Sequence, residues 1–383
     1  MRALSIFLSI FTLLFCLSPV HAQNFTLQLQ EKLTIGEEVS DSTEYLFANI
    51  RDIRPLKDEQ LLVANGADNS LRIFNMNGRF IRKFGGRGRG PGEFHEISSI
   101  EITQDNRILL IDRYQNRVTI FSNTGEFLDT IGLPISNMTN AQFILQREGG
   151  GSFFIGYRDF YNPEDQGHYL HLFDENIEQE LSRHLNIFDH FFDSSIHAEV
   201  RMSQVPRYYS VRFGAQQIGF TTSIYTGIVA SLDERNLNER RFGQPLSYFY
   251  ELYDWEDRRV HFDSNQRGFM SISGQGNNYL IKRKGATLGL IGNRDFLLHF
   301  YALFQDEETI PYVHIYSSHG TLLRTISLNK TGISFIKNGK IRSVKPLYLD
   351  ENNRLYVADN YYKGSYPAVR IFETNLEELL EEN

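Results

Sequence analysis

Cysteine is almost absent from this chain of 383 residues, and the single one, Cys16, lies near the amino terminus. Once that segment is removed, the protein can form no disulfide, no thiolate metal site and no cysteine nucleophile. Tryptophan is nearly absent too, with Trp255 as its only example. These absences exclude a disulfide-stapled fold and every mechanism that depends on a thiolate.

Motifs of catalysis are also missing. The chain contains no Gly-x-Ser-x-Gly elbow of the kind that supports a serine hydrolase. Residues 85–92 are rich in glycine, but they lack the Gly-Lys-Ser/Thr of a Walker loop and lead through Phe94 into a predicted strand. A connecting loop is therefore favoured over a phosphate site, although Arg87 and Arg89 could meet an anion.

Positive charge is in deficit as well. The 39 Lys and Arg residues are outnumbered by 47 Asp and Glu residues, which gives a net charge of −8. Loss of Arg2 with the amino-terminal segment would make the mature chain one unit more negative. This balance argues against non-specific binding to nucleic acid and against docking on anionic lipid.

The amino terminus predicts export. Arg2 gives a positive start, residues 4–17 form an apolar run of signal-peptide length, and Val20–Ala22 resembles a small-x-small cleavage site. We expect a signal peptide over 1–22 and a single mature domain over 23–383, periplasmic or secreted. Export without disulfides suits a bacterial envelope protein. The apolar run is too short for stable membrane insertion.

A lipoprotein is the less favoured alternative for this segment. Lipid attachment needs a small residue directly before the acylated cysteine, whereas Phe15 precedes Cys16. We therefore expect no lipid on the mature chain.

The chain repeats itself within its first third. Residues 61–85 read LLVANGADNSLRIFNMNGRFIRKFG, and residues 108–132 read ILLIDRYQNRVTIFSNTGEFLDTIG. When Phe74 is placed on Phe121, 47 residues later, three further pairs align: Asn69 with Asn116, Gly78 with Gly125, and Gly85 with Gly132. A period of this length, with short alternating strands and Asn-x-Gly turns, indicates a β-propeller blade.

Weaker copies follow, and with the first two they predict six blades. These copies lie at 169–185, 227–242, 313–328 and 355–372. The last copy lacks its own outer strand, but Phe25–Gly36 is a lone alternating strand that ends as a blade does. Because a ring with unjoined ends would present open edges, we expect this strand to close the last blade. The predicted fold is all-β, a six-bladed propeller with four-stranded antiparallel blades.

Two runs carry a resemblance to a known family. Residues 84–94 read FGGRGRGPGEF, and residues 112–118 read DRYQNRV. They resemble NHL repeats, and the chain is similar to the six-bladed, NHL-like propellers exported by Bacteroidota-type bacteria. The similarity is good over 45–135 and 345–373 and poor between them, where 243–293 could hold a seventh blade or an insertion. The resemblance implies architecture and export rather than a specific activity.

The recurrent polar residues have a structural interpretation. Asp112 and Asn116 recur by repeat position, and Asp and Asn stabilise turns by bonding nearby backbone. The histidines lack the tight pair plus distant ligand that zinc sites use, so no metal or other cofactor is expected. One alternative is calcium, because some related propellers are calcium-dependent hydrolases. That resemblance would make Glu44, Asp112, Asn116 and Asp359 ligands in the channel.

The best candidate site is an insertion rather than a motif. Residues 186–213 exceed what a blade connection needs, and long loops on rigid scaffolds are often functional. We expect them to lie across one mouth of the propeller, beside a second insertion at Tyr248–Asp257. Aromatic and arginine side chains favour flat ligands, sugars or a protein partner. The candidate binding residues are His197, Arg201, Arg207, Tyr208, Tyr209 and Trp255. The other interpretation, an insertion whose aromatic residues simply cover the core, stays open.

Two functions remain open at this point. The first is a non-catalytic module of the bacterial envelope that binds a protein or a carbohydrate-like ligand. The second is a metal-assisted hydrolase or lyase that works in the central channel. Fold alone cannot decide between them. Three or more carboxylate or amide groups converging on the channel axis would favour the enzyme, whereas an apolar axis would favour the binding module.

Overall fold

A computed structural model describes most of the chain. The described residues are 25–134, 138–139, 141–159, 167–186, 191, 208–246, 249–254, 269–274, 277–305, 308–329, 331–337 and 340–381. Among them, no helix is long and apolar enough to cross a membrane. The predicted signal peptide, 1–22, lies outside the described residues.

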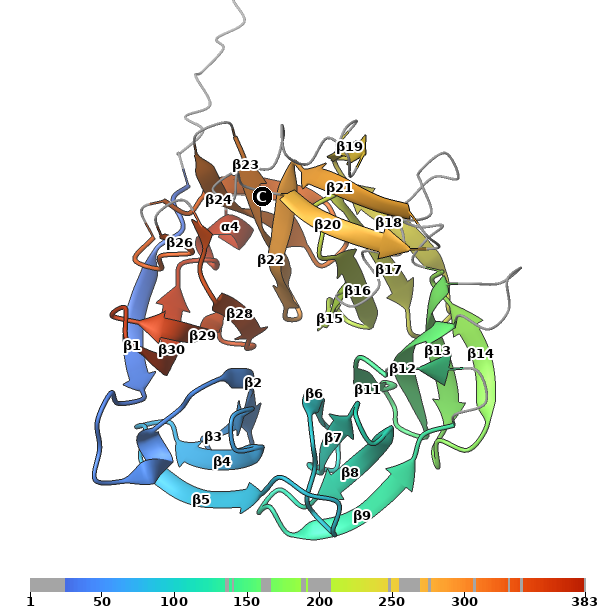
Figure 1. The fold of residues 1–383 in the computed structure, drawn as a ribbon, viewed down its shortest axis with the longest axis vertical. Helices are drawn as coiled ribbons and strands as arrows, with labels where there is room; N and C mark the ends of the chain where they lie inside the picture. Colours follow the sequence, from blue (N-terminus) through green and yellow to red (C-terminus); the bar gives the residue numbers. More distant parts are fainter. Residues whose placement is uncertain are drawn as a thin grey trace, which may run out of the picture.

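Six antiparallel sheets follow one another around a ring, and each forms one blade (Figure 1). Blade 1 contains β2 (Ile50–Leu56), β3 (Gln60–Asn65), β4 (Ser70–Asn75) and β5 (Phe80–Gly85). Blade 2 contains β6 (Ile97–Ile102), β7 (Ile108–Asp112), β8 (Arg117–Phe121) and β9 (Phe127–Gly132). Blade 3 contains β10 (Met138–Thr139), β11 (Ile144–Gln146), β12 (Ser152–Asp159), β13 (Gly167–Asp174) and β14 (Glu180–His184).

The second half of the ring continues in the same way. Blade 4 contains β15 (Tyr208–Phe213), β16 (Gln217–Thr222), β17 (Ile228–Asp233) and β18 (Glu239–Gly243). Blade 5 contains β22 (Gly285–Gly292), β23 (Phe296–Phe304), β24 (Thr309–Ser317) and β25 (Leu322–Ser327). Blade 6 contains β28 (Val344–Leu349), β29 (Arg354–Tyr362), β30 (Tyr366–Thr374) and β1 (Leu29–Ile35). The strands β2, β6, β11, β15, β22 and β28 lie nearest the centre (Figure 1).

The amino-terminal strand closes the ring, as the sequence predicts. β1 pairs antiparallel with β30, with Leu29 opposite Thr374 and Ile35 opposite Val369. Ile35 is buried and packs in a cluster that joins blade 6 to blade 1. The last blade therefore takes its outer strand from the start of the described chain, and β30 is paired on both sides.

The seven-blade alternative is wrong, because the extra residues between blades 4 and 5 form a separate small sheet. Its strands, in the order of pairing, are β19 (Tyr250–Asp254), β21 (Asn277–Arg283) and β20 (Phe269–Gly274). The remaining elements are a hairpin of β26 (Ile336–Lys337) and β27 (Lys340–Ile341), a short helix η1 (Thr43–Tyr45) and α4 (Glu378–Glu381).

The recurrent Asp and Asn residues stabilise turns. Asp112 accepts hydrogen bonds from the backbone N–H groups of His95 at 2.7 Å and Tyr114 at 3.1 Å. Asn116 has a φ of +47°, and its side chain donates to the carbonyl oxygen of Leu133 at 3.2 Å. Asn tolerates this left-handed backbone better than most residues, and Asn69 holds the equivalent position in blade 1 with a φ of +50°.

Candidate functional site: the channel cavity

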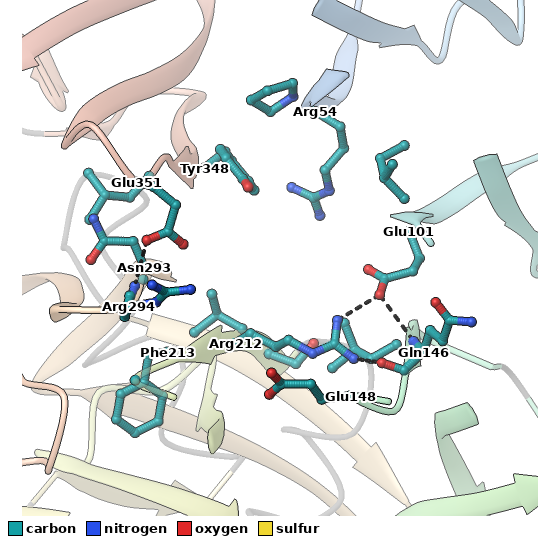
Figure 2. Close-up of a pocket in the computed structure, with 18 of the residues that line it drawn as sticks. Arg54, Glu101, Gln146, Glu148, Arg212, Phe213, Asn293, Arg294, Tyr348 and Glu351 are labelled. Carbon is teal, nitrogen blue, oxygen red and sulfur yellow. Dashed lines mark hydrogen bonds and ion pairs between the residues drawn. The ribbon is translucent and has the colours of Figure 1, made fainter. Parts of the chain in front are cut away.

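The central channel holds a cavity of about 380 Å³ at the carboxyl ends of the inner strands (Figure 2). Every blade contributes to its wall through an inner strand or the turn that follows. One side chain from each blade, in order, is Arg54, Glu101, Gln146, Arg212, Arg294 and Tyr348. Small-molecule sites typically measure roughly 300–1,000 Å³, so this cavity has the size of a ligand site.

The repeat explains why polar side chains reach the channel. Arg54 and Glu101 are 47 residues apart and hold the same position on β2 and β6. The preceding residues, Ile53 and Ile100, are buried in the core. Because side chains alternate along a strand, burial of one set turns the next residue toward the axis. Tyr348 has the same place on β28 and lines the same cavity.

Arg212 joins three blades through one guanidinium group. Its Nη1 donates to Glu101 Oε1 of blade 2 at 2.6 Å, and its Nε donates to Glu234 Oε1 of its own blade at 3.0 Å. Its Nη2 donates to the carbonyl oxygen of Gln146 in blade 3. Burial disfavours the charged guanidinium, but the two carboxylates outweigh that effect, so the pKa of Arg212 is raised. The guanidinium and both carboxylates of this network are therefore used in contacts within the protein.

Arg54 links blade 1 to both of its neighbours. It donates to the carbonyl oxygens of Ile100 at 3.1 Å and Leu347 at 3.2 Å, and its guanidinium lies 5.6 Å from the ring centroid of Tyr348. It also forms an ion pair of 3.1 Å with Asp52. Burial raises the pKa of the Asp52 carboxyl, although Arg54 opposes the shift, and burial likewise raises the pKa of Tyr348. The inner wall is thus a rigid polar frame rather than a set of free side chains.

The rim of the cavity is different, because its charged groups are exposed. Glu148, Arg294 and Glu351 all line the cavity and face solvent. Glu351 Oε2 accepts the backbone N–H of Arg294 at 3.4 Å, a long hydrogen bond. The Arg294 guanidinium has no hydrogen bond or ion pair to any residue that the structure describes. These rim groups are the ones available to a ligand.

The acidic residues do not converge on a metal site. Within the described part of the chain, no group of three or more His, Cys, Asp or Glu side chains could hold a metal ion. Of the candidate calcium ligands, Asp112 caps a turn, Glu44 accepts a hydrogen bond from Ser42, and Asp359 forms ion pairs with Arg342 and Arg370 at 3.3 Å and 3.5 Å. The structure therefore does not bring the proposed calcium set together.

The structure places only some of the residues that the sequence suggested for binding. Tyr209 is half-buried on β15, and its hydroxyl donates to the carbonyl oxygen of Thr287 at 3.2 Å. Tyr208 begins the same strand. Residues 208–213, assigned to the insertion by length, are thus an inner strand, because the insertion ends where pairing with β16 starts. Four candidates lie outside the described residues: His197, Arg201, Arg207 and Trp255.

One described residue within the insertion favours the core-covering interpretation. Phe191 is buried and packs against side chains of blades 3 and 4. The insertion enters β15 at its amino end, whereas Arg212 and the cavity lie at its carboxyl end. The insertion and the cavity are therefore attached to opposite ends of the same strand.

Sequence reasoning missed the channel residues, although one signal was present. The 47-residue offset that aligns Phe74 with Phe121 also aligns Arg54 with Glu101, which are oppositely charged residues at the same position of two strands. Arg212 gave no such signal, because its partner Glu101 lies 111 residues away and blade 4 matches the repeat poorly. Long-range ion pairs of this kind depend on the closed ring.

These features define the class of protein as a six-bladed β-propeller with a polar central cavity. The chain belongs to the DUF5128 family, described as a 6-bladed beta-propeller, whose model matches residues 40–243. No curated protein matches the chain.

Two solved structures from Bacteroides share the fold. One is a protein of Bacteroides fragilis, provisionally described as exported, with a TM-score of 0.54 and 15% identity over 91% of this chain and 94% of that one. The other is a member of the DUF4221 family from Bacteroides vulgatus, with a TM-score of 0.57 and 10% identity over 91% of this chain and 98% of that one. At these identities the likeness concerns the fold alone.

Proposed function

We propose that this protein is an exported, NHL-like binding module of the bacterial envelope that holds a compact polar ligand in the channel cavity without chemical change. The amino-terminal sequence and the exported description of the Bacteroides fragilis relative support the location. The observation that carries the binding role is the rigid polar wall, built from all six blades, beneath an exposed charged rim.

The composition of the cavity also bears on the enzyme alternative. Carboxylate and amide groups do meet there, which by number alone would favour catalysis. Glu101, however, is ion-paired with Arg212, and the Asn293 amide is used in a contact with the neighbouring blade, where it donates to the Asp350 carbonyl oxygen at 2.8 Å. A general acid or base needs a proton to exchange and access to the substrate. The polar groups of the inner wall are instead used in contacts within the protein. This geometry therefore supports binding better than it supports catalysis.

The ligand chemistry follows from the same side chains. Tyr348 and Arg54 offer an aromatic ring and a guanidinium, and the rim offers both signs of charge through Arg294 and Glu351. Aromatic rings and directional hydrogen bonds suit sugars and short peptides. A carbohydrate-like ligand or a protein segment is the proposed partner. The insertion residues Arg207 and Tyr208 remain candidates for a second set of contacts.

The test is a binding screen of the mature protein, residues 23–383. A panel of neutral and charged oligosaccharides and tripeptides is scored by thermal shift, and each hit is measured by calorimetry and recovered for mass spectrometry. We expect at least one compound to bind and to be recovered unchanged. Arg294→Gln should weaken that binding, whereas Arg79→Gln, an exposed residue on the turn between β4 and β5, should leave it unaltered.

Two outcomes would contradict this function. If a compound is recovered cleaved or rearranged, the protein is an enzyme. If Arg294→Gln has no effect while Arg207→Ala combined with Tyr208→Ala abolishes binding, the site lies on the insertion and not in the channel.

A further inference from the structure

A second cavity lies on the face of the propeller opposite to the channel cavity, where blades 1 and 2 meet. It measures about 470 Å³ and is formed by the turn after β3, the loop between β5 and β6, and the turn after β7. These segments adjoin the amino ends of β2 and β6, whereas the channel cavity adjoins the carboxyl ends. The two cavities are therefore separate sites.

Two arginines without protein partners line this cavity. Arg51 and Arg87 are both exposed, and neither guanidinium has a hydrogen bond or an ion pair to any residue described in the structure. The Arg51 side chain lies across Gly66, where an added Cβ would come within 2.7 Å of its Cγ and Nε. The glycine therefore leaves room for the arginine to lie along the cavity wall.

Two of the carboxylates nearby are paired with cations, while the buried Asp112 accepts hydrogen bonds from backbone N–H groups and from Gln115. Glu96 lines the cavity but pairs with Arg113 at 2.7 Å. Asp68, on the adjacent turn, pairs with Arg72 and Lys83, both at 2.9 Å. Arg51 and Arg87 thus leave a local excess of positive charge on a chain whose net charge is −8.

A hydrogen-bond chain fixes a third donor. Gln115 Nε2 lies 2.6 Å from Asp112 Oδ2, 2.9 Å from the carbonyl oxygen of Gly88 and 3.0 Å from His95 Nδ1. Since the first two partners can only accept, this atom is the amide nitrogen. Its two hydrogens serve three neighbours, so one hydrogen is shared, and His95 Nδ1 faces it as an acceptor. The proton of the neutral imidazole is therefore assigned to Nε2, which makes His95 a donor through that atom.

An aromatic ring completes the cavity. Tyr114 stacks on His95 with ring centroids 5.2 Å apart and an interplanar angle of 21°. Tyr114 is 68% exposed, so its other face is open to solvent. The stacked pair gives the cavity a fixed wall next to the two arginines.

We propose that this cavity binds an oxyanion, namely a phosphate, sulfate or carboxylate group, between Arg51 and Arg87, with His95 as a further donor. Guanidinium groups match the geometry of such anions through paired hydrogen bonds and bind them more strongly than neutral donors do. The glycine-rich loop provides Arg87, but it acts as a connection between blades and not as a Walker loop.

The test is calorimetric titration of the mature protein with sodium sulfate, sodium phosphate and sodium acetate, each at constant ionic strength maintained with chloride. We expect saturable binding of at least one of the three. The anion that binds most tightly shows whether the cavity prefers a sulfate, a phosphate or a carboxylate group. Arg51→Gln and Arg87→Gln should each weaken that binding by about tenfold, as expected for loss of a charged hydrogen bond.

The matched control is Arg89→Gln, which removes an exposed arginine from the same loop without touching the cavity wall. It should change the affinity for the anion by less than about twofold. Loss of a charged hydrogen bond would have a much larger effect. Absence of saturable binding for all three anions would overturn the proposal. An equal loss in the Arg89→Gln variant would overturn it too, because the binding would then reflect overall charge.

Discussion

Arg212 and Glu101 hold the inner strand of blade 3 between them. Arg212 Nη1 donates to Glu101 Oε1 at 2.6 Å, and the same Oε1 accepts the backbone N–H of Gln146 at 3.0 Å. Arg212 Nη2 in turn donates to the Gln146 carbonyl oxygen. β11 is only three residues long, and the backbone N–H and carbonyl groups of its last residue, Gln146, are bonded by side chains from the two neighbouring blades. The Arg212–Glu101 ion pair thus helps to hold the short inner strand of blade 3 in place.

Replacing Arg212 by Met should destabilise the protein. Glu234, whose side chain is 1% exposed, would lose its cationic partner, as would the largely buried Glu101. Leaving buried carboxylates unpaired should lower the free energy of unfolding by about 2–4 kcal/mol. Urea denaturation measures this. The matched control is Arg235→Gln, which breaks the ion pair of the exposed Arg235 with Asp233 and should cost less than about 1 kcal/mol. Equal stability of both variants would show that the ion pair is incidental.

Closure by the amino-terminal strand predicts a second loss of stability. Ile35→Ala removes a buried side chain that packs where β1 meets β30, and it should cost about 2–4 kcal/mol of unfolding free energy. Val39→Ala, at an exposed position four residues later, should cost almost nothing. Deleting Phe25–Gly36 should cost several kcal/mol, a large part of a typical stability of about 5–15 kcal/mol. A deletion variant that melts with the full mature chain would contradict this closure.

Acid should destabilise the protein through two buried histidines between blades 4 and 5. Burial lowers the pKa of His299 to about 3 and that of His314 to about 4, from an ordinary value near 6.5. His314 Nε2 lies 2.6 Å from the hydroxyl of Tyr225, and His299 Nε2 lies 3.1 Å from the hydroxyl of Thr287. The unfolded chain therefore binds more protons than the folded one between about pH 4 and pH 6.5. Stability is complete above this window and falls as the pH drops through it.

The size of this acid effect can be measured. By pH 5, each histidine should cost about 2 kcal/mol of unfolding free energy relative to pH 7. Urea denaturation at the two pH values gives the difference directly. His319→Gln, at an exposed position, should leave the pH dependence unaltered, whereas His299→Gln with His314→Gln should flatten it. Stability that is the same at pH 7 and pH 5 in the unmodified protein would refute the assignment.

Processing of the amino terminus gives a further prediction. The mature protein should begin near Gln23 and carry no lipid, because Val20–Ala22 resembles a cleavage site and Phe15 disfavours acylation of Cys16. Intact-mass analysis of protein from the producing cell decides this. A mass that corresponds to an acylated Cys16 would make the protein a lipoprotein.

The repeat was sufficient to predict the ring. The glycine turns and the asparagines at positions 69 and 116 identify blades 1 and 2, and the lone strand before them predicts closure because a ring must pair its last edge. Blade 4 shows the limit of this signal. By composition, Tyr208–Phe213 looks like the end of a long loop. It forms a strand because it pairs with β16. The composition of these six residues does not by itself reveal that pairing.

The channel site was harder to predict, for a physical reason. Its side chains come from six strands spread over about 300 residues, and only the closed ring brings Arg54, Glu101 and Arg212 around one axis. Aromatic and arginine content pointed instead to the insertion. The same composition also suits a buried cover, and Phe191, the one residue described between 187 and 207, is buried.

The most direct test of the channel site is a crystal structure of the mature protein with the compound selected by the binding screen. The predicted result is the intact compound inside the cavity, in contact with Tyr348 and Arg294. A cleaved or rearranged compound at that place would make the protein an enzyme. A compound bound on the outer rim of the blades or on the insertion, with the cavity empty, would contradict the channel as the binding site.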